Sequence, residues 1–172
     1  RVFLSSPGDV SEERQLAMDV MEQVPYNPQL RGKISLEVVA WDKPGAGTPL
    51  LANMTPQEAI NQGLPRPSEC DIVIVLFWTR IGTLLSDTHK KADGSRYLSG
   101  TEWEYWDAFN HAKIHKTPYI VVYRRTERLL IDPMTRDGAE KFSQIMMVNS
   151  FFKDFTNPDG SFQKGYNNYN KP

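Results

Sequence analysis

The alternation of apolar runs with amphipathic segments in this 172-residue chain predicts an α/β fold with a doubly wound, mostly parallel sheet. Two observations support this prediction. The run Asp71–Trp78 is apolar on both faces, as expected for a central parallel strand. The segments also follow one another in the order β-α-β-α-β-α-β-α. This order implies right-handed crossovers and a flavodoxin-like sheet with helices on both faces.

The composition is that of a globular domain and argues against several classes of partner. The chain is 40% apolar and 24% charged, and its net charge of −1 gives no reason to expect nucleic acid or an anionic membrane. No run approaches the ~20 apolar residues of a membrane span, so we expect a cytoplasmic location. Cys70 is the only cysteine, which excludes an internal disulfide and favours a buried, inert thiol. The three histidines lack metal-ligand spacing, so no metal site is expected.

The N-terminal residues predict the first strand and the first helix. Val2–Ser5 is a short apolar strand, and the turn-forming residues after it lead into a helix over Val10–Val24. Asp9 has the residue type and position of an N-cap for that helix. The buried face is expected at three apolar residues with helical spacing: Leu16, Val20 and Val24. The chain opens without an initiator Met, so we expect it to be a piece of a longer protein.

The middle of the chain predicts an edge strand, a loop and a short helix. Ile34–Trp41 alternates between apolar and polar residues, which favours a strand at or near an edge. Asp42–Asn53 is rich in Gly and Pro and is predicted to be a loop. Thr55 then begins a short helix that ends near Gly63.

The C-terminal half predicts a loop over 83–100, a helix that contains Glu104, a fourth strand over Pro118–Arg124 and a long amphipathic helix over Asp137–Phe155. We therefore expect an α/β domain over residues 1–155. The remaining residues, 156–172, are rich in Asn, Gly and Tyr and are expected to form an irregular tail.

A flavodoxin-like sheet with strand order 2-1-3-4 places its ligand crevice between the first and third strands, at their carboxyl ends. Hydroxyl groups and helix N–H groups there can hold a phosphate or a ribose, and an aromatic ring beside an Arg suits a base plus a phosphate. The same residues can also serve only as turns, caps and core contacts. The candidate substrate-binding residues are Ser5, Ser6, Pro7, Gly8, Asp9, Trp41, Asp42, Trp78, Arg80, Gly82 and Thr101.

Glu104 is the candidate catalytic residue. Its neighbours at helical spacing, Gly100, Thr101 and Ala108, are small and leave space beside the carboxylate. A carboxylate in such a slot can hold a ribose hydroxyl and stabilise the oxocarbenium-like transition state of glycosidic cleavage. However, Thr101-x-x-Glu104 is also a capping-box pattern, so the alternative is that Glu104 only caps its own helix.

Five segments of the chain carry a resemblance to a known family: Val2–Val10, Cys70–Val73, Trp78–Gly82, Thr101–Tyr105 and Lys116–Pro118. They resemble the DUF4062 family, whose members are TIR-like domains often found at the N-termini of STAND-type NTPases and repeat proteins. The resemblance covers most of the chain up to about residue 125. It implies a TIR-like fold and a place in a larger defence or signalling protein, such as one in antiviral defence.

A second resemblance concerns the candidate catalytic residue. Gly100-Thr101-x-x-Glu104-x-x-x-Ala108 is similar to the catalytic segment of nucleoside 2-deoxyribosyltransferases, in which the matching Glu acts on the anomeric carbon. TIR NADases place a Glu in a corresponding helix. Both comparisons imply N-glycosidic chemistry at Glu104 rather than at Glu102.

Together these observations favour an NAD⁺ glycohydrolase that cleaves the nicotinamide–ribose bond. It would use NAD⁺ as its substrate, with no cofactor and no metal. It would be activated by self-association through an adjoining oligomerising module. One alternative is a non-catalytic homotypic interaction or scaffold module. Another is a nucleoside or nucleotide N-glycosidase, or an enzyme similar to the deoxyribosyltransferases.

Overall fold

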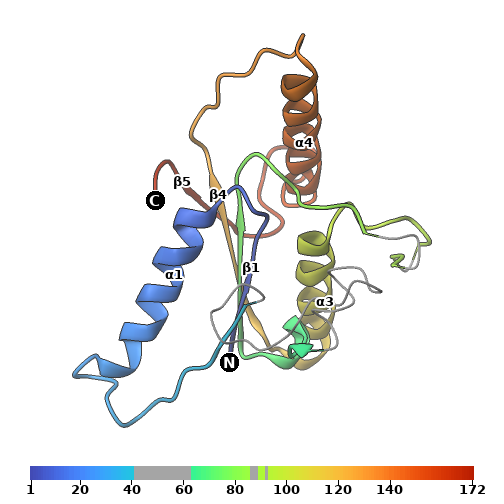
Figure 1. Ribbon diagram of the computed structural model, residues 1–172. Coiled ribbons are helices and arrows are strands. Elements are labelled where there is room, and N and C mark those ends of the chain that lie inside the picture. Colours follow the sequence, from blue (N-terminus) through green and yellow to red (C-terminus); the bar gives the residue numbers. More distant parts are fainter. Residues whose placement is uncertain (41–62, 86–88, 92) are drawn as a thin grey trace.

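The computed structural model describes residues 1–40, 63–85, 89–91 and 93–172, and these residues form a five-stranded parallel sheet (Figure 1). The strand order is β2-β1-β3-β4-β5, with every neighbouring pair parallel. The predicted order 2-1-3-4 is therefore confirmed. The strands are β1 (Val2–Ser5), β2 (Val38–Val39), β3 (Ile72–Phe77), β4 (Tyr119–Arg125) and β5 (Asn167–Tyr169).

Helices cover both faces of the sheet, as the fold class requires. The helix α1 (Ser11–Gln23) lies on one face, and α3 (Gly100–His115) and α4 (Arg136–Lys153) lie on the other (Figure 1). Two short 3₁₀ turns, η1 (Val24–Tyr26) and η2 (Pro67–Glu69), complete the described elements.

The sheet separates two hydrophobic cores, and β3 contributes to both. Val73, Val75 and Phe77 face α3 and α4, whereas Ile74 and Leu76 face α1. This two-sided burial explains why the β3 sequence is apolar at successive positions.

The core beneath α3 and α4 is largely aromatic. The Phe77 and Phe151 ring centroids are 4.9 Å apart, and those of Tyr105 and Phe151 are 5.1 Å apart. Phe155 is 1% exposed and packs beside them. These contacts fix the C-terminal half of α4 against the sheet and against α3.

The predicted buried face of α1 was wrong. Leu16 and Val20 are 48% and 60% exposed, whereas Arg14 and Met21 are buried. The buried stripe instead runs through Val10, Arg14 and Met21, at spacings that also fit one face of a helix. The sequence argument missed it because the stripe contains a charged residue.

Two further differences concern strand lengths and the tail. The predicted strand Ile34–Trp41 is reduced to β2, which pairs with β1 over only Val38 and Val39. The tail expected to be irregular supplies β5, which pairs with Tyr123–Arg125 of β4. Asn167–Tyr169 is polar, so no apolar pattern marked this strand. The predicted loop from Asp42 and the helix from Thr55 lie outside the described residues.

Candidate functional site

Ser5 and Glu104 meet where β1 ends beside α3. The Ser5 hydroxyl donates a hydrogen bond of 2.5 Å to Glu104 Oε2. Ser5 is the last residue of β1 and Glu104 lies in the second turn of α3, and both side chains are buried. Because β1 and β3 are the strands at which the chain order reverses, this contact lies where doubly wound folds bind ligands.

The first turn of α3 is capped by Ser99, and not by Thr101 as the alternative prediction had it. The N-cap is Ser99, whose hydroxyl accepts a hydrogen bond of 3.1 Å from the backbone N–H of Glu102. The Glu102 carboxylate accepts from the backbone N–H of Leu98 and pairs with Lys91 Nζ at 2.7 Å. The interpretation of Thr101-x-x-Glu104 as the capping box was therefore wrong. Ser99-x-x-Glu102 is an overlapping copy of the same pattern, and the local sequence cannot choose between them.

Gly82 brings the loop after β3 against the start of α3. Its φ of +118° is one that residues with a side chain rarely adopt. A Cβ at this position would lie 3.0 Å from Ser99 Cβ and 3.4 Å from Thr101 Oγ1. Gly82 and Thr101 therefore lie side by side, with Thr101 one helical turn before Glu104.

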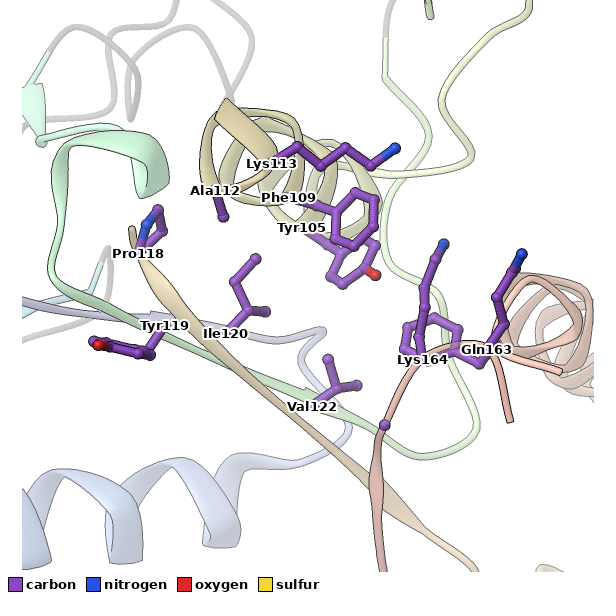
Figure 2. Close-up of a pocket in the computed structure, with 12 residues that line it drawn as sticks. Tyr105, Phe109, Ala112, Lys113, Pro118, Tyr119, Ile120, Val122, Gln163 and Lys164 are labelled. Atoms are coloured by element: carbon purple, nitrogen blue, oxygen red, sulfur yellow. The ribbon is translucent and has the colours of Figure 1, made fainter. Parts of the chain in front are cut away.

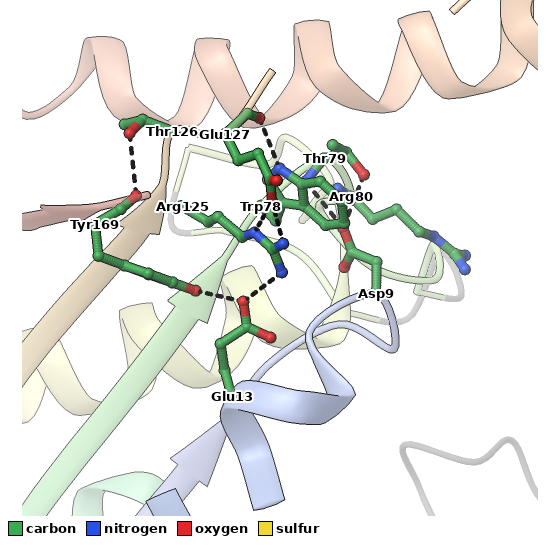
Figure 3. Close-up of polar contacts among 9 residues, drawn as sticks. All are labelled: Asp9, Glu13, Trp78, Thr79, Arg80, Arg125, Thr126, Glu127 and Tyr169. Atoms are coloured by element: carbon green, nitrogen blue, oxygen red, sulfur yellow. Dashed lines mark hydrogen bonds and ion pairs between the residues drawn. The ribbon is translucent and has the colours of Figure 1, made fainter. Parts of the chain in front are cut away.

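Asp9 connects the loop after β1 to the loop after β3. Its Oδ2 atom accepts hydrogen bonds of 2.9 Å from both the backbone N–H and the hydroxyl of Thr79, and one of 3.0 Å from the Arg80 N–H (Figure 3). The prediction that Asp9 caps α1 was wrong, since the N-cap is Val10 and no side chain caps the helix there. Asp9 instead ties the loop after β1 to the loop after β3.

A buried guanidinium lies beside the turn after β1. Arg14 is 3% exposed, and its Nη1 donates to the Leu4 carbonyl at 3.3 Å and to the Ser6 hydroxyl at 2.9 Å. Pro7 is buried beside Ser6, whereas Gly8 is exposed with open space around it. The sequence analysis did not identify Arg14 as a buried residue. The signal that could have shown it is its helical spacing from Val10 and Met21, which are buried on the same face.

Trp78 belongs to a different polar cluster. Its indole N–H donates to the Glu127 carbonyl at 3.0 Å, and the Arg125 guanidinium lies 4.1 Å from its ring centroid (Figure 3). Arg80 is exposed, and its side chain extends away from this cluster. Trp41 and Asp42 lie outside the described residues.

That cluster contains a buried ion pair, which the sequence did not reveal. Glu13 on α1 is 7% exposed, and its Oε1 pairs with Arg125 Nη1 at 2.8 Å and accepts from the Tyr169 hydroxyl at 3.1 Å. Arg125 also pairs with Glu127. Burial, together with the adjacent Glu13 carboxylate, raises the pKa of Tyr169 above its usual range. The cluster joins α1 to β4 and β5, and in it one guanidinium, that of Arg125, pairs with two carboxylates, those of Glu13 and Glu127.

A cavity of about 450 Å³ lies between α3 and the C-terminal segment (Figure 2). Lys113 and Lys164 approach the Phe109 ring to 4.8 and 4.6 Å from its centroid. Lys164 Nζ also lies over Trp106 and Phe155, and burial lowers the pKa of its amine. The two amines lie over aromatic rings of the core. Neither Ser5 nor Glu104 lines this cavity.

The arrangement offers the Glu104 carboxylate for chemistry at the β1–β3 junction. Ser5, Gly82, Thr101 and Glu104 come from three segments that meet there. A carboxylate held by a hydroxyl in this way can orient a sugar hydroxyl and stabilise a developing positive charge. Within the described ranges, no group of three His, Cys, Asp or Glu side chains could hold a metal ion.

Two further observations complete the description. Among the described residues, no helix has the length and apolar character needed to cross a membrane. No family model matches the chain, and neither does a curated protein or a solved structure.

Proposed function

We propose that this chain is a TIR-like effector domain that hydrolyses the nicotinamide–ribose bond of NAD⁺, with Glu104 as the catalytic carboxylate. The observation that supports the proposal is the hydrogen bond between Ser5 and Glu104, which directs Glu104 to the end of β1. Ser99 supplies the side chain that caps α3, so capping does not account for Glu104.

In the proposed reaction, Glu104 accepts hydrogen bonds from ribose hydroxyls and stabilises the positive charge that develops on the ribose ring. The bond between C1′ and the nicotinamide nitrogen breaks, and its electron pair stays with neutral nicotinamide. Water adds to C1′ and releases a proton. Ser5 is a positioning residue that fixes the Glu104 side chain before the substrate arrives.

The surroundings of the pair supply the remaining contacts. We expect Gly82 and Thr101, which lie side by side at the start of α3, and Ser6 and Pro7, which follow Ser5, to contact the substrate. The buried Arg14 guanidinium donates to the Ser6 hydroxyl and holds it in the turn after β1. The reaction uses NAD⁺ as substrate and requires neither a cofactor nor a metal.

We further propose that the domain belongs to a larger cytoplasmic defence or signalling protein of the STAND NTPase type. In that protein, self-association through an adjoining module activates it. A second candidate function, a non-catalytic interaction module, is favoured by exposed apolar side chains around α4. Leu130 and Met134 before the helix are 98% and 90% exposed, and Phe142 and Met146 within it are each 49% exposed.

The deciding experiment measures nicotinamide release from NAD⁺ by the purified chain, at high concentration and after forced dimerisation. We expect Glu104→Gln to lower turnover by about 100-fold or more, because it removes the charge that stabilises the transition state. Glu102→Gln is the matched control, since it changes a carboxylate that is also buried, two residues away. We expect it to lower thermal stability while the folded enzyme keeps its turnover.

Full turnover by Glu104→Gln would overturn the catalytic role. If folded wild-type protein released no nicotinamide in either state, the NADase proposal would be wrong. Profiling released bases by mass spectrometry in the same reactions would then separate a nucleoside glycosidase from the interaction module.

A further inference from the structure

A second cavity, of about 480 Å³, opens at the carboxyl ends of β3 and β4. It lies between the segment that follows β4 and the helix α4, and its lining includes Trp78, Arg124, Arg128, Asn149, Tyr166 and Asn168. This volume is within the range of small-molecule sites. Neither Ser5 nor Glu104 lines it.

The cavity carries positive charge that the surrounding described residues do not neutralise. Arg124 and Arg128 both line it, and neither has an ion pair with any residue in the described ranges. Arg125, between them in sequence, is paired with Glu13 and Glu127. Glu127 is the one acidic residue in the lining. The three arginines of the lining therefore outnumber the two carboxylates, Glu13 and Glu127, with which Arg125 pairs.

Arg124 is held in place without losing its charge. Its Nη2 donates to the Asn149 side-chain carbonyl, and its guanidinium lies 4.6 Å from the centroid of the Phe152 ring. A guanidinium has five N–H donors, so a fixed Arg124 can still present a pair of them to a ligand. Planar paired donors match phosphate oxygens.

The other walls suit an organic group attached to that phosphate. Leu129 and Ile145 supply apolar surface, and Tyr166 supplies an aromatic ring. The Asn168 amide on β5 adds a polar group that can donate or accept. Inorganic phosphate would use the arginines alone and leave these walls without a contact.

We propose that this cavity binds an organic phosphate of nucleotide size, with Arg124 and Arg128 holding the phosphate groups. The site is separate from Glu104 and does not depend on the proposed reaction. Trp78 lines this cavity. The proposal therefore assigns Trp78 to this second site, whereas the sequence suggested that it binds substrate together with Glu104.

The test is calorimetric titration of the purified chain with ADP, and with inorganic phosphate in parallel. We expect ADP to bind, and Arg128→Gln to weaken its binding about tenfold or more through loss of a charge-assisted contact. Arg128 is exposed, so this variant should fold normally. Arg124→Gln should weaken binding at least as much, but its guanidinium packs on Phe152 and its folding must be checked by circular dichroism.

A control separates the site from general charge effects. Arg31→Gln removes the same charge from an exposed position that does not line the cavity, and it should leave ADP binding unchanged. Equal weakening by Arg31→Gln, equal affinity for inorganic phosphate, or no ADP binding at about 10 mM would each overturn the proposal.

Discussion

The two edges of the parallel sheet differ in how deeply their polar side chains are buried. At the carboxyl edge, the side chains of Ser5, Glu13 and Glu104 are buried and bind residues from distant elements. At the amino edge, Glu37 pairs with Arg1, and both side chains are at least half exposed. Among these described residues, polar side chains are buried at the carboxyl edge and exposed at the amino edge. Doubly wound folds bind ligands at the carboxyl edge because the connections diverge there.

The largest expected effect is the loss of turnover in Glu104→Gln. The next largest is a loss of stability, and it is expected when Glu13 is replaced. Glu13→Gln leaves Arg125 without its buried carboxylate partner, so we expect the free energy of unfolding to fall by about 2 kcal/mol. Urea unfolding followed by circular dichroism measures the change. Glu37→Gln is the amino-edge control and should cost less than about 0.5 kcal/mol, because its ion pair is exposed. Equal losses in the two variants would contradict the difference between the edges.

A smaller effect is expected from Ser5→Ala. The variant removes the hydroxyl that donates to buried Glu104, so we expect a loss of about 1 kcal/mol in stability and about tenfold in turnover. Thermal melts and nicotinamide release measure the two quantities. Ser150→Ala, at an exposed position of α4, should change neither. If Ser5→Ala behaved in the same way as Ser150→Ala, the positioning role of Ser5 would be lost.

The smallest effect is expected at the amino edge, where Cys70 precedes β3. Burial raises the pKa of its thiol from 9.0 to about 11. As the pH rises, the thiol loses its proton at a lower pH in the unfolded chain than in the folded one. Cys70 therefore leaves stability unchanged below pH 9 and lowers it between pH 9 and 11. At pH 8 we expect alkylation by iodoacetamide to be about 100-fold slower in the native protein than in urea. Mass spectrometry of the labelled protein measures this rate, and equal rates would show that the thiol is open to solvent.

The sequence predicted the parts of the site that topology determines. An apolar β3 and the order of elements were enough to place the end of β1 beside the helix after β3, which is where Ser5 and Glu104 lie. The sequence could not decide which of two overlapping patterns, Ser99-x-x-Glu102 or Thr101-x-x-Glu104, caps α3. Ser99 caps α3, and the pairing of Glu102 with Lys91 is a contact that a local pattern does not contain.

The buried arginine and the last strand were missed for related reasons. Arg14 occupies a core stripe because the Leu4 carbonyl and the Ser6 hydroxyl accept its hydrogen bonds. Neither partner can be recognised from the helix that carries Arg14. The polar strand Asn167–Tyr169 forms because β4 offers a free edge, and not because of its own β-propensity.

By itself the sequence determined the fold class and the strand order, because these follow from apolar periodicity and the handedness of crossovers. Only the tertiary structure decided the partners of the buried polar side chains. Ser5 and Glu104 are 99 residues apart in the chain, and Asp9 and Thr79 are 70 apart. A buried polar group must find a partner wherever the folded chain supplies one, and that partner is set by packing rather than by neighbouring residues.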